Sequence, residues 1–251
     1  MRQLNIVYYA YIDRQSAWKD IVSGQLRQLK EYGLFEKTKY YIHITDTSQI
    51  FMDVLYLIQE ICPLATISTS VKNEFEYDAL KLIYTLANER PDEIYIYLHT
   101  KGMGRHKDFR ITDEIALTTK TFKDWRKNLQ LFENSKINKV GLLPAVENHI
   151  RNPQSTSVGG WIWFNFWYAR GSYLARCNQP VKQSNRYLFE EWLGGEQDET
   201  AVSNNDCYSL HYKSIHYFTA SEAIKEFRSI KANMGLNPWG DEANFNGFIW
   251  Q

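Results

Sequence analysis

Four consecutive residues, His99, Thr100, Lys101 and Gly102, form a segment whose groups could bind an anion. Lys101 is a compact cation, and the side chains of His99 and Thr100 can donate hydrogen bonds. Gly102 has no side chain, so a ligand can approach the backbone closely there. A strand-ending turn with a solvated lysine would have the same sequence, and both interpretations stay open at this point.

Acidic residues occur in two further segments. Glu74, Glu76 and Asp78 alternate along the chain, and carboxylate oxygens are the ligands that hard divalent cations prefer. An acidic residue at the start of a helix is equally well explained by the helix dipole. In the second segment Glu190 follows Arg186 by one helical turn, so the arginine could orient the carboxylate. The alternative is a pair of solvated glutamates on a helix surface.

Common cofactor and catalytic motifs are absent from the sequence. The first strand-to-helix turn contains neither G-x-G-x-x-G nor G-x-x-x-x-G-K-[ST], the motifs that bind dinucleotides and nucleoside triphosphates. H-E-x-x-H, paired Cys-x-x-Cys and G-x-S-x-G do not occur either. The three cysteines are far apart in the sequence and indicate neither a zinc site nor a disulfide framework. These absences argue against dehydrogenases, nucleoside triphosphatases and ordinary methyltransferases.

The composition excludes further classes of protein. The 29 Lys and Arg balance the 29 Asp and Glu, so there is no basic excess for a phosphate backbone and we expect no nucleic-acid partner. No apolar run is long enough for a transmembrane segment, which leaves peripheral membrane association open. The first residues lack the apolar region of a secretory signal, and we expect a cytoplasmic protein. Aromatic residues make up 15% of the 251 residues, an unusually high share.

The first 145 or so residues alternate between strand and helix patterns. Strands are expected at residues 5–12, 40–44, 65–71 and 93–99. Helices are expected at residues 18–29, 48–61, 78–88 and 115–132. Gly33 is the expected end of the first helix, Ser48 the N-cap of the second, and Trp125 a core residue of the fourth. This succession predicts an α/β fold with a Rossmann-type, mostly parallel sheet, whose ligand lies beyond the carboxyl ends of the strands.

The second half of the chain has a different pattern. Residues 139–146 predict another buried strand, and residues 161–173 hold seven aromatics in thirteen positions. From the alternation we expect Ile162, Phe164 and Phe166 to lie in the core on one face of a strand. The C-terminal third is rich in turn-forming residues, so we expect mainly loops there, and its periodicity indicates little about helices or strands.

Four segments carry a resemblance to a known family. They are residues 75–80 (FEYDAL), 97–102 (YLHTKG), 165–170 (NFWYAR) and 186–194 (RYLFEEWLG). In this order they resemble a little-characterised family of glycosyltransferase-like proteins of the GT-A fold, whose segments are "FEYxxL", "YLHTKG", "GNFWWAR" and "RYxxExWLG". The resemblance covers about residues 4–195 and includes a "W…QL…GL" pattern near the start. Four ordered motifs are more specific than any one alone.

The resemblance implies that a sugar is transferred from a nucleotide-sugar donor to a hydroxyl group of a glycan or another acceptor. Glu190 matches the glutamate of the family motif and would act as general base, removing the proton of the acceptor hydroxyl. Arg186 would orient it from the acceptor side. His99, Thr100, Lys101 and Gly102 would bind the nucleotide sugar, with Lys101 against the diphosphate.

Three residues of the third segment would line the sugar and the acceptor. They are Asn165, Trp167 and Arg170. Aromatic faces pack on the apolar face of a sugar, and an amide both donates to and accepts from hydroxyl groups. The family's "HFSGN" stands here as WIWFN, residues 161–165, so bulky side chains replace small ones and no acceptor preference follows.

Further donor-binding candidates are chosen by their place at strand ends. Tyr9 and Tyr11 lie near the end of the first strand and could stack on the nucleobase or contact its edge. Asp46 follows the second strand and could accept a hydrogen bond from the base or ribose, and Glu76 follows the third. All four lie where ligands of open α/β sheets bind.

The metal requirement departs from the pattern of GT-A enzymes. These enzymes commonly hold a divalent cation with an Asp-x-Asp motif, and this chain has His-Thr-Lys-Gly at that place. We hypothesise donor binding that is independent of Mn²⁺ or Mg²⁺, or only weakly assisted by either. The carboxylates of residues 74–78 are the alternative ligands, and the metal residues stay unassigned.

The predicted organisation is a single GT-A-like catalytic domain over residues 1–195 with a C-terminal extension, residues 196–251, packed on it. Residues 1–110 form the nucleotide-binding half and residues 111–195 the acceptor half. Two alternatives stay open: a non-catalytic carbohydrate- or nucleotide-binding domain of the same fold, and a different Rossmann-like transferase. The donor, the acceptor, the stereochemical outcome and the oligomeric state are not specified by the sequence.

Overall fold

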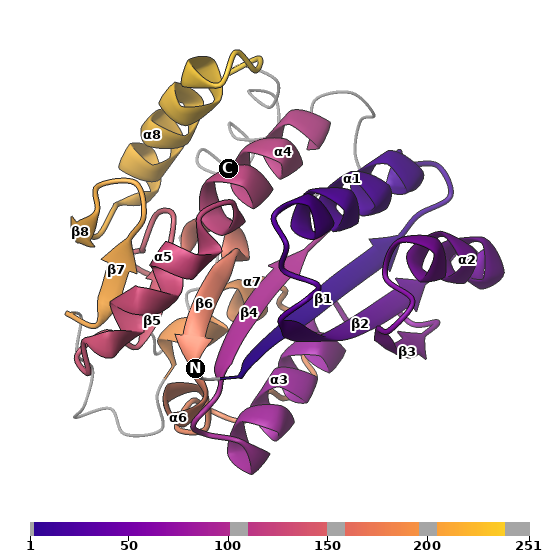
Figure 1. Cartoon of the computed structure of the whole chain (residues 1–251), viewed down its shortest axis with the longest axis horizontal. Coiled ribbons are helices and arrows are strands. Elements are labelled where there is room, and N and C mark those ends of the chain that lie inside the picture. The colour runs from indigo at the N-terminus through magenta and orange to yellow at the C-terminus, as the bar shows by residue number, and fades with distance from the viewer. Residues whose placement is uncertain (1–2, 101–109, 150–158, 196–204, 239–251) are drawn as a thin grey trace.

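The computed structural model describes residues 3–100, 110–149, 159–195 and 205–238. Within these ranges the strands form one eight-stranded sheet, and helices lie on both of its faces (Figure 1). The order of its strands is β3-β2-β1-β4-β6-β5-β7-β8. The strands are β1 Leu4–Ile12, β2 Thr38–Asp46, β3 Thr66–Ser70, β4 Ile94–His99, β5 Lys139–Gly141, β6 Trp167–Arg170, β7 Cys207–Ser209 and β8 Ser214–Ile215.

The sheet has a parallel half and a mixed half. Strands β3, β2, β1 and β4 are parallel neighbours, whereas β6 runs antiparallel to both β4 and β5. Strand β7 then pairs in parallel with β5, so the C-terminal segment extends the same sheet. The predicted α/β class is therefore confirmed: the sheet is mostly parallel, and a Rossmann-type half is followed by an antiparallel strand.

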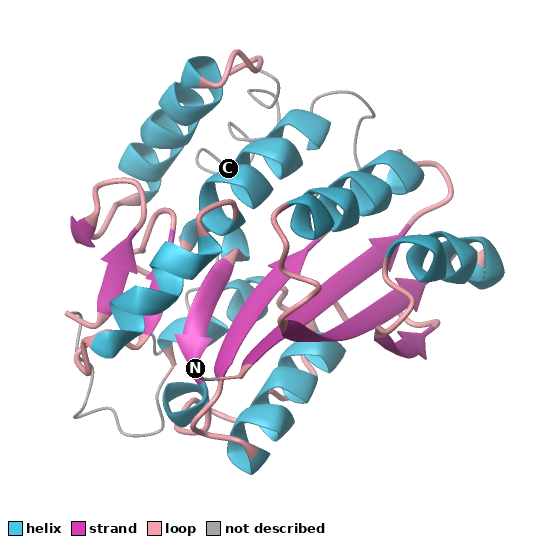
Figure 2. Ribbon diagram, viewed as in Figure 1, coloured by secondary structure: helices cyan, strands magenta, loops and turns pink. Residues whose placement is uncertain are grey.

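Helices cover the two faces of the sheet unequally. They are α1 Trp18–Glu31, α2 Phe51–Ile61, α3 Tyr77–Glu89, α4 Arg110–Phe122, α5 Trp125–Gln130, α6 Gly171–Leu174, α7 Tyr187–Glu190 and α8 Ala220–Asn233, with 3-10 turns η1 Leu131–Glu133, η2 Trp163–Asn165 and η3 Trp192–Gly194. One core lies between the sheet and α1, α2, α4, α5 and α8. The other lies between the sheet and α3, α6 and α7. Figure 2 shows α1, α2 and α4 in front of the strands, with α3 behind them.

The central strands form where the sequence is continuously apolar or aromatic. All nine residues of β1 except Tyr11 are buried, and all six of β4 are buried. Strands covered by helices on both faces have this composition, because each face must pack against a helix. Helix α1 ends before Gly33, whose φ of +71° lies in the left-handed region that glycine adopts without strain.

Two predictions about helix ends were wrong. Ser48 does not cap α2: the helix begins at Phe51, and the Asp46 carboxylate accepts hydrogen bonds from the backbone N–H groups of Ser48 (2.8 Å) and Ile50 (2.7 Å). An aspartate two residues before a turn can bond its own backbone in this way. The single helix expected over residues 115–132 is divided into α4 and α5, although Trp125 is buried as predicted.

The aromatic segment also departs from its expected geometry. Strand β5 is confined to three residues of the predicted range 139–146. Ile162, Phe164 and Phe166 are buried, but they do not share one strand face: Ile162 packs in the core beside α3, and the two phenylalanines pack in the other. The reason is the backbone at Phe164 and Asn165, whose φ angles of +71° and +61° turn the chain before β6 begins.

Helix α8 lies in the segment for which mainly loops were expected. Thr219 caps it by accepting a hydrogen bond from the Glu222 backbone N–H, and the Glu222 carboxylate accepts one from the Thr219 backbone in return. Lys231 of α8 forms a buried ion pair of 2.6 Å with Asp113 of α4. None of the helices in the described ranges has both the length and the apolar character needed to span a membrane.

Candidate functional site

A row of four polar side chains crosses the parallel half of the sheet. The strand register aligns His99 of β4 with Tyr9 of β1, Tyr9 with His43 of β2, and His43 with Ser68 of β3. Residues in register on neighbouring strands project from the same face. The rings of Tyr9 and His43 lie 6.2 Å apart and nearly parallel. The row therefore places one histidine on each side of Tyr9, near the carboxyl ends of the strands.

The start of α3 supplies one carboxylate to each histidine. Glu76, immediately before the helix, lies with Oε1 3.8 Å from His99 Nδ1. Asp78, in the first turn, lies with Oδ2 3.4 Å from His43 Nε2. The acidic residues that the sequence suggested as a joint cation site are thus divided between two partners. Glu74 is engaged elsewhere, with Lys182 and Lys72.

Glu76 is the centre of a buried hydrogen-bond network. Its Oε2 accepts hydrogen bonds from the Tyr97 hydroxyl at 2.7 Å and from Asn165 Nδ2 at 2.6 Å. Asn165 Oδ1 in turn accepts from Trp167 Nε1 at 2.7 Å. Glu76 is 8% exposed and Asn165 2% exposed. Burial, together with Glu76, raises the pKa of Tyr97 well above its ordinary value, which keeps it a hydrogen-bond donor.

The network also fixes the orientation of His99. Its Nε2 lies 3.2 Å from the carbonyl oxygen of Phe164, and a carbonyl can only accept, so Nε2 must carry a proton. The ring stacks on Tyr97 with centroids 6.0 Å apart. Nδ1 consequently faces the Glu76 carboxylate. Three of the four motif segments meet in this way, although they lie far apart along the chain.

Unusual backbone conformations are concentrated at this network. Five non-glycine residues in the described ranges have positive φ, and three of them, Phe75, Phe164 and Asn165, flank the contact between Glu76 and Asn165. A bulky residue such as phenylalanine is rare in that region. Each such residue costs on the order of 1–3 kcal/mol and persists only where its surroundings require it. The concentration indicates a functional constraint on this part of the molecule.

Helix α7 brings the fourth motif segment to the same place. Phe189 packs against the rings of Phe75 and Tyr77, at centroid distances of 6.3 and 6.4 Å. Arg186 and Glu190 form an ion pair of 3.0 Å, and the Glu190 side chain is 13% exposed. Burial lowers the pKa of Arg186, but the negative charge of Glu190 and other contacts outweigh this, so the pKa lies above its ordinary value. Arg186 therefore stays charged beside Glu190.

The neighbouring glutamate has a different role. Glu191 is 2% exposed, and its Oε1 accepts a hydrogen bond from the backbone N–H of His149. The His149 ring stacks on Tyr187 of α7 with centroids 4.3 Å apart. These contacts connect α7 to the chain that leaves β5. Neither Glu191 nor His149 was a candidate from the sequence, because nothing in a Glu-Glu pair shows which member is buried.

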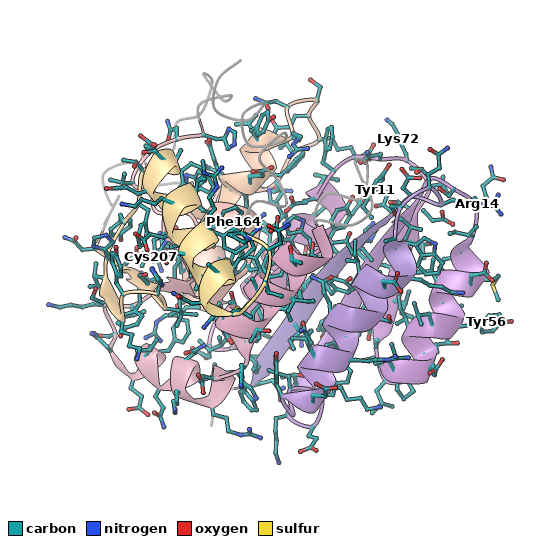
Figure 3. All side chains as sticks on the ribbon, turned by 90° about the horizontal axis from the view of Figure 1, so that it is seen from above. Tyr11, Arg14, Tyr56, Lys72, Phe164 and Cys207 are labelled. Carbon is teal, nitrogen blue, oxygen red and sulfur yellow. The ribbon has the colours of Figure 1, made fainter. Side chains whose placement is uncertain are left out.

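Several predicted donor-binding residues form hydrogen bonds with the backbone near the carboxyl ends of the strands. Thr100 Oγ1 accepts from the Tyr11 backbone N–H at 2.9 Å and lies 3.2 Å from the Tyr11 carbonyl, which ties the end of β4 to β1. Both oxygens of Asp46 hold the turn before α2. Tyr9 is buried within the row, whereas Tyr11 is partly exposed. Figure 3 shows Tyr11 on the same side of the molecule as Arg14 and Lys72, away from Cys207.

Two predicted residues of the sugar and acceptor side differ from expectation. Arg170 pairs in register with Ile94 at the start of β4, whereas His99 lies at the other end of that strand. Its guanidinium donates to the carbonyls of Phe132, Ile137 and Asn134, so the structure does not bring it to the network. Trp167 is fully buried, and in this structure it holds Asn165 in place.

Lys101 and Gly102, predicted at the diphosphate, lie outside the described residues. Within the ranges that the structure describes, no three His, Cys, Asp or Glu side chains are grouped as metal ligands. The metal requirement stays a prediction. The described residues do bring together Glu76, His99 and Asn165 in one network, with the ion pair of Arg186 and Glu190 beside it, at the start and the end of α7.

Comparisons with known proteins concern the fold. No family model and no curated protein matches this chain. The chain is similar to a crystal structure of 4-diphosphocytidyl-2C-methyl-D-erythritol synthase, with a TM-score of 0.44 and 9% identity over 81% of this chain and 93% of that one. It is also similar to a crystal structure of S. aureus TarS 1-349, with a TM-score of 0.42 and 10% identity. That alignment covers 92% of this chain and 64% of the TarS chain, slightly less than two thirds of its length.

Proposed function

We propose that this protein is a glycosyltransferase that moves a sugar from a nucleotide-sugar donor to a hydroxyl group of a glycan or another acceptor. One observation carries the proposal. Glu76, His99 and Asn165, from three motif segments, form a single buried contact network, and the fourth segment packs beside it with Glu190. Motifs that are dispersed in sequence and adjacent in space are expected of a binding site and not of independent surface features.

Glu190 is the proposed general base. A carboxylate near an acceptor hydroxyl takes its proton as the oxygen attacks the sugar, while the nucleoside diphosphate leaves. The ion pair with Arg186 at 3.0 Å supports this role, because it holds the carboxylate in one orientation on the short helix α7. The partial exposure of the Glu190 side chain leaves it accessible to an acceptor, in contrast to buried Glu191.

The donor would bind at the carboxyl edge of the sheet. His99 ends β4 and Thr100 follows it, directly before Lys101 and Gly102, and Lys101 is the proposed cation at the diphosphate. Tyr11 is the candidate for the nucleobase. We further propose that Mn²⁺ or Mg²⁺ is not required for donor binding, and that the protein acts in the cytoplasm, either free or at a membrane surface.

The decisive experiment replaces Glu190 by Gln. We expect turnover of the accepted nucleotide sugar, identified from a panel, to fall on the order of 10²- to 10⁴-fold, the usual contribution of a general base. Donor affinity, measured by calorimetry with and without chelator, should stay nearly unchanged. The matched control is Glu60→Gln on α2, because this side chain is 71% exposed and the residue is far from Glu190 in the sequence. Unchanged turnover in Glu190→Gln would refute the assignment of the base.

A specific observation favours a second candidate, a non-catalytic carbohydrate- or nucleotide-binding domain. Glu76, Tyr97, Asn165 and Trp167 satisfy one another's hydrogen bonds inside the core, as a purely structural network would. In that case the protein would bind a nucleotide sugar or glycan without turnover across the whole panel. The same assay therefore separates the two functions.

A further inference from the structure

A second cluster lies at the edge of the sheet, around His43. Strand β3 is the last strand on its side, and Ser68 on this strand is exposed. The Ser68 hydroxyl lies 2.9 Å from His43 Nδ1. The other ring nitrogen, Nε2, lies 3.1 Å from the Ser70 hydroxyl and 3.4 Å from Asp78 Oδ2. The imidazole of His43 thus contacts the Ser68 hydroxyl through one ring nitrogen and the Asp78 carboxylate through the other.

We propose that Ser68, His43 and Asp78 form a second reactive site, in which the Ser68 hydroxyl is acylated by activated carboxylic esters. A nucleophile within hydrogen-bond reach of a base, with the base held by a third group, is the general signature of covalent catalysis. This arrangement is recognised by geometry and roles, and it occurs on unrelated folds and in different chain orders. The site is independent of Glu190 and of the proposed sugar transfer.

The protonation state of His43 fits the role of a base. The residue is 5% exposed, and burial lowers its pKa below the ordinary value, although Asp78 acts in the opposite direction. The ring is therefore neutral at neutral pH, with one nitrogen available to accept a proton. If Nδ1 accepts the hydrogen bond of Ser68, the ring proton resides on Nε2, which faces Asp78 and Ser70. The hydrogen-bond partners on the two sides of the ring are consistent with this tautomer.

The surroundings hold the imidazole in place. Tyr9 stacks beside the ring, and the Ser70 hydroxyl is also 2.9 Å from Thr45 Oγ1, so the groups on the Nε2 side form a short chain. An edge strand has alternate backbone N–H groups directed away from the sheet. Next to Ser68, such groups could donate hydrogen bonds to the oxyanion of an acyl-transfer intermediate.

The proposed reaction balances without a further reactant. Ser68 Oγ forms a bond to the carbonyl carbon of the ester and passes its proton to His43 Nδ1. The bond from that carbon to the leaving oxygen breaks, and the leaving group takes the proton from the imidazole. Water then attacks the acyl-serine with the same base, which releases the carboxylic acid and restores Ser68. Asp78 stabilises the imidazolium that forms in both steps.

The test uses the full chain and p-nitrophenyl acetate. We expect a burst of p-nitrophenol, an increase of one acetyl group in the intact mass, and an acetylated peptide that contains Ser68. Ser68→Ala should remove the burst and the label. His43→Gln should slow acylation on the order of 100-fold, the scale of a lost general base, and Asp78→Asn should slow it less.

The matched control is Thr69→Ala, an exposed residue on the same strand, which should be acylated at the wild-type rate. Circular dichroism and the unfolding midpoint of each variant check that it is folded. Absence of a burst in the folded wild-type protein would overturn the proposal. So would an acetyl group on another residue, or acylation of Ser68 at the same rate in His43→Gln.

Discussion

The two histidines of the polar row are both buried, with His99 7% and His43 5% exposed, but their hydrogen-bond partners differ in access to solvent. His99 and His43 both lie next to Tyr9, and each faces a carboxylate from the start of α3. The other ring nitrogen of His99 donates a hydrogen bond to the carbonyl of Phe164 inside the core. The other ring nitrogen of His43 contacts the hydroxyl of Ser68, an exposed residue.

This difference separates two uses of the same chemistry. A buried network in which every member is satisfied rigidifies its region and is costly to disturb, because each group left alone keeps its desolvation penalty. A network that ends at an exposed hydroxyl costs little to disturb, since water replaces the lost partner. We therefore expect substitutions of Glu76 and its partners to change stability and site geometry, and substitutions around Ser68 to change reactivity.

The largest effect is expected from Glu76→Ala. The substitution leaves the Tyr97 hydroxyl and Asn165 Nδ2 without their acceptor in the core. A buried donor that loses its partner costs about 1–3 kcal/mol, so we expect a loss of about 3 kcal/mol in the free energy of unfolding. Urea denaturation monitored by tryptophan fluorescence measures it.

The control for this prediction is Glu89→Ala at the other end of α3. Its side chain is 60% exposed, and a surface change of this kind stays within about 0.5 kcal/mol. Equal losses for the two variants would show that the loss in Glu76→Ala does not come from its buried hydrogen bonds.

The sequence predicts much of the frame that carries this row. Continuous apolar runs indicated β1 and β4, and helical spacing with Gly33 indicated α1, because burial on both faces or on one stripe leaves a strong pattern. The motifs indicated His99 on the donor side and Asn165 on the acceptor side, and the position after the third strand indicated Glu76. Their predicted roles at a nucleotide sugar stay predictions.

The remainder depends on contacts that a linear pattern does not contain. The row from His99 to Ser68 follows from strand register, which is set by the assembled sheet and not by either strand alone. The turn at Phe164 and Asn165 interrupts an alternation that is typical of a strand. Helix α8 did leave a signal, the capping box of Thr219 and Glu222, which the loop-rich composition obscured.

An intermediate effect is expected from the pH dependence of stability. The pKa of His43 is lower in the folded protein than in the unfolded chain, where it is about 6.5. Below that pH the unfolded chain binds the proton more readily, so the contribution of His43 to stability is complete above pH 6.5 and is lost as the pH falls. His43→Gln should lose less stability than wild type between pH 7 and pH 5, as measured by urea denaturation at each pH. Equal pH slopes would mean that His43 titrates alike in both states.

The smallest effect on stability is expected from Ser68→Ala, and it is the sharpest test of the comparison. Because Ser68 is exposed and water can replace its hydroxyl at His43 Nδ1, the free energy of unfolding should change by no more than about 0.5 kcal/mol, as for other surface substitutions. Thr69→Ala on the same strand gives the reference value. A loss of about 2 kcal/mol in Ser68→Ala alone would show that its hydrogen bond is a buried structural contact. The hydrogen bonds of His43 would then be as inaccessible to water as those of Glu76, and the contrast between the two histidines would no longer hold.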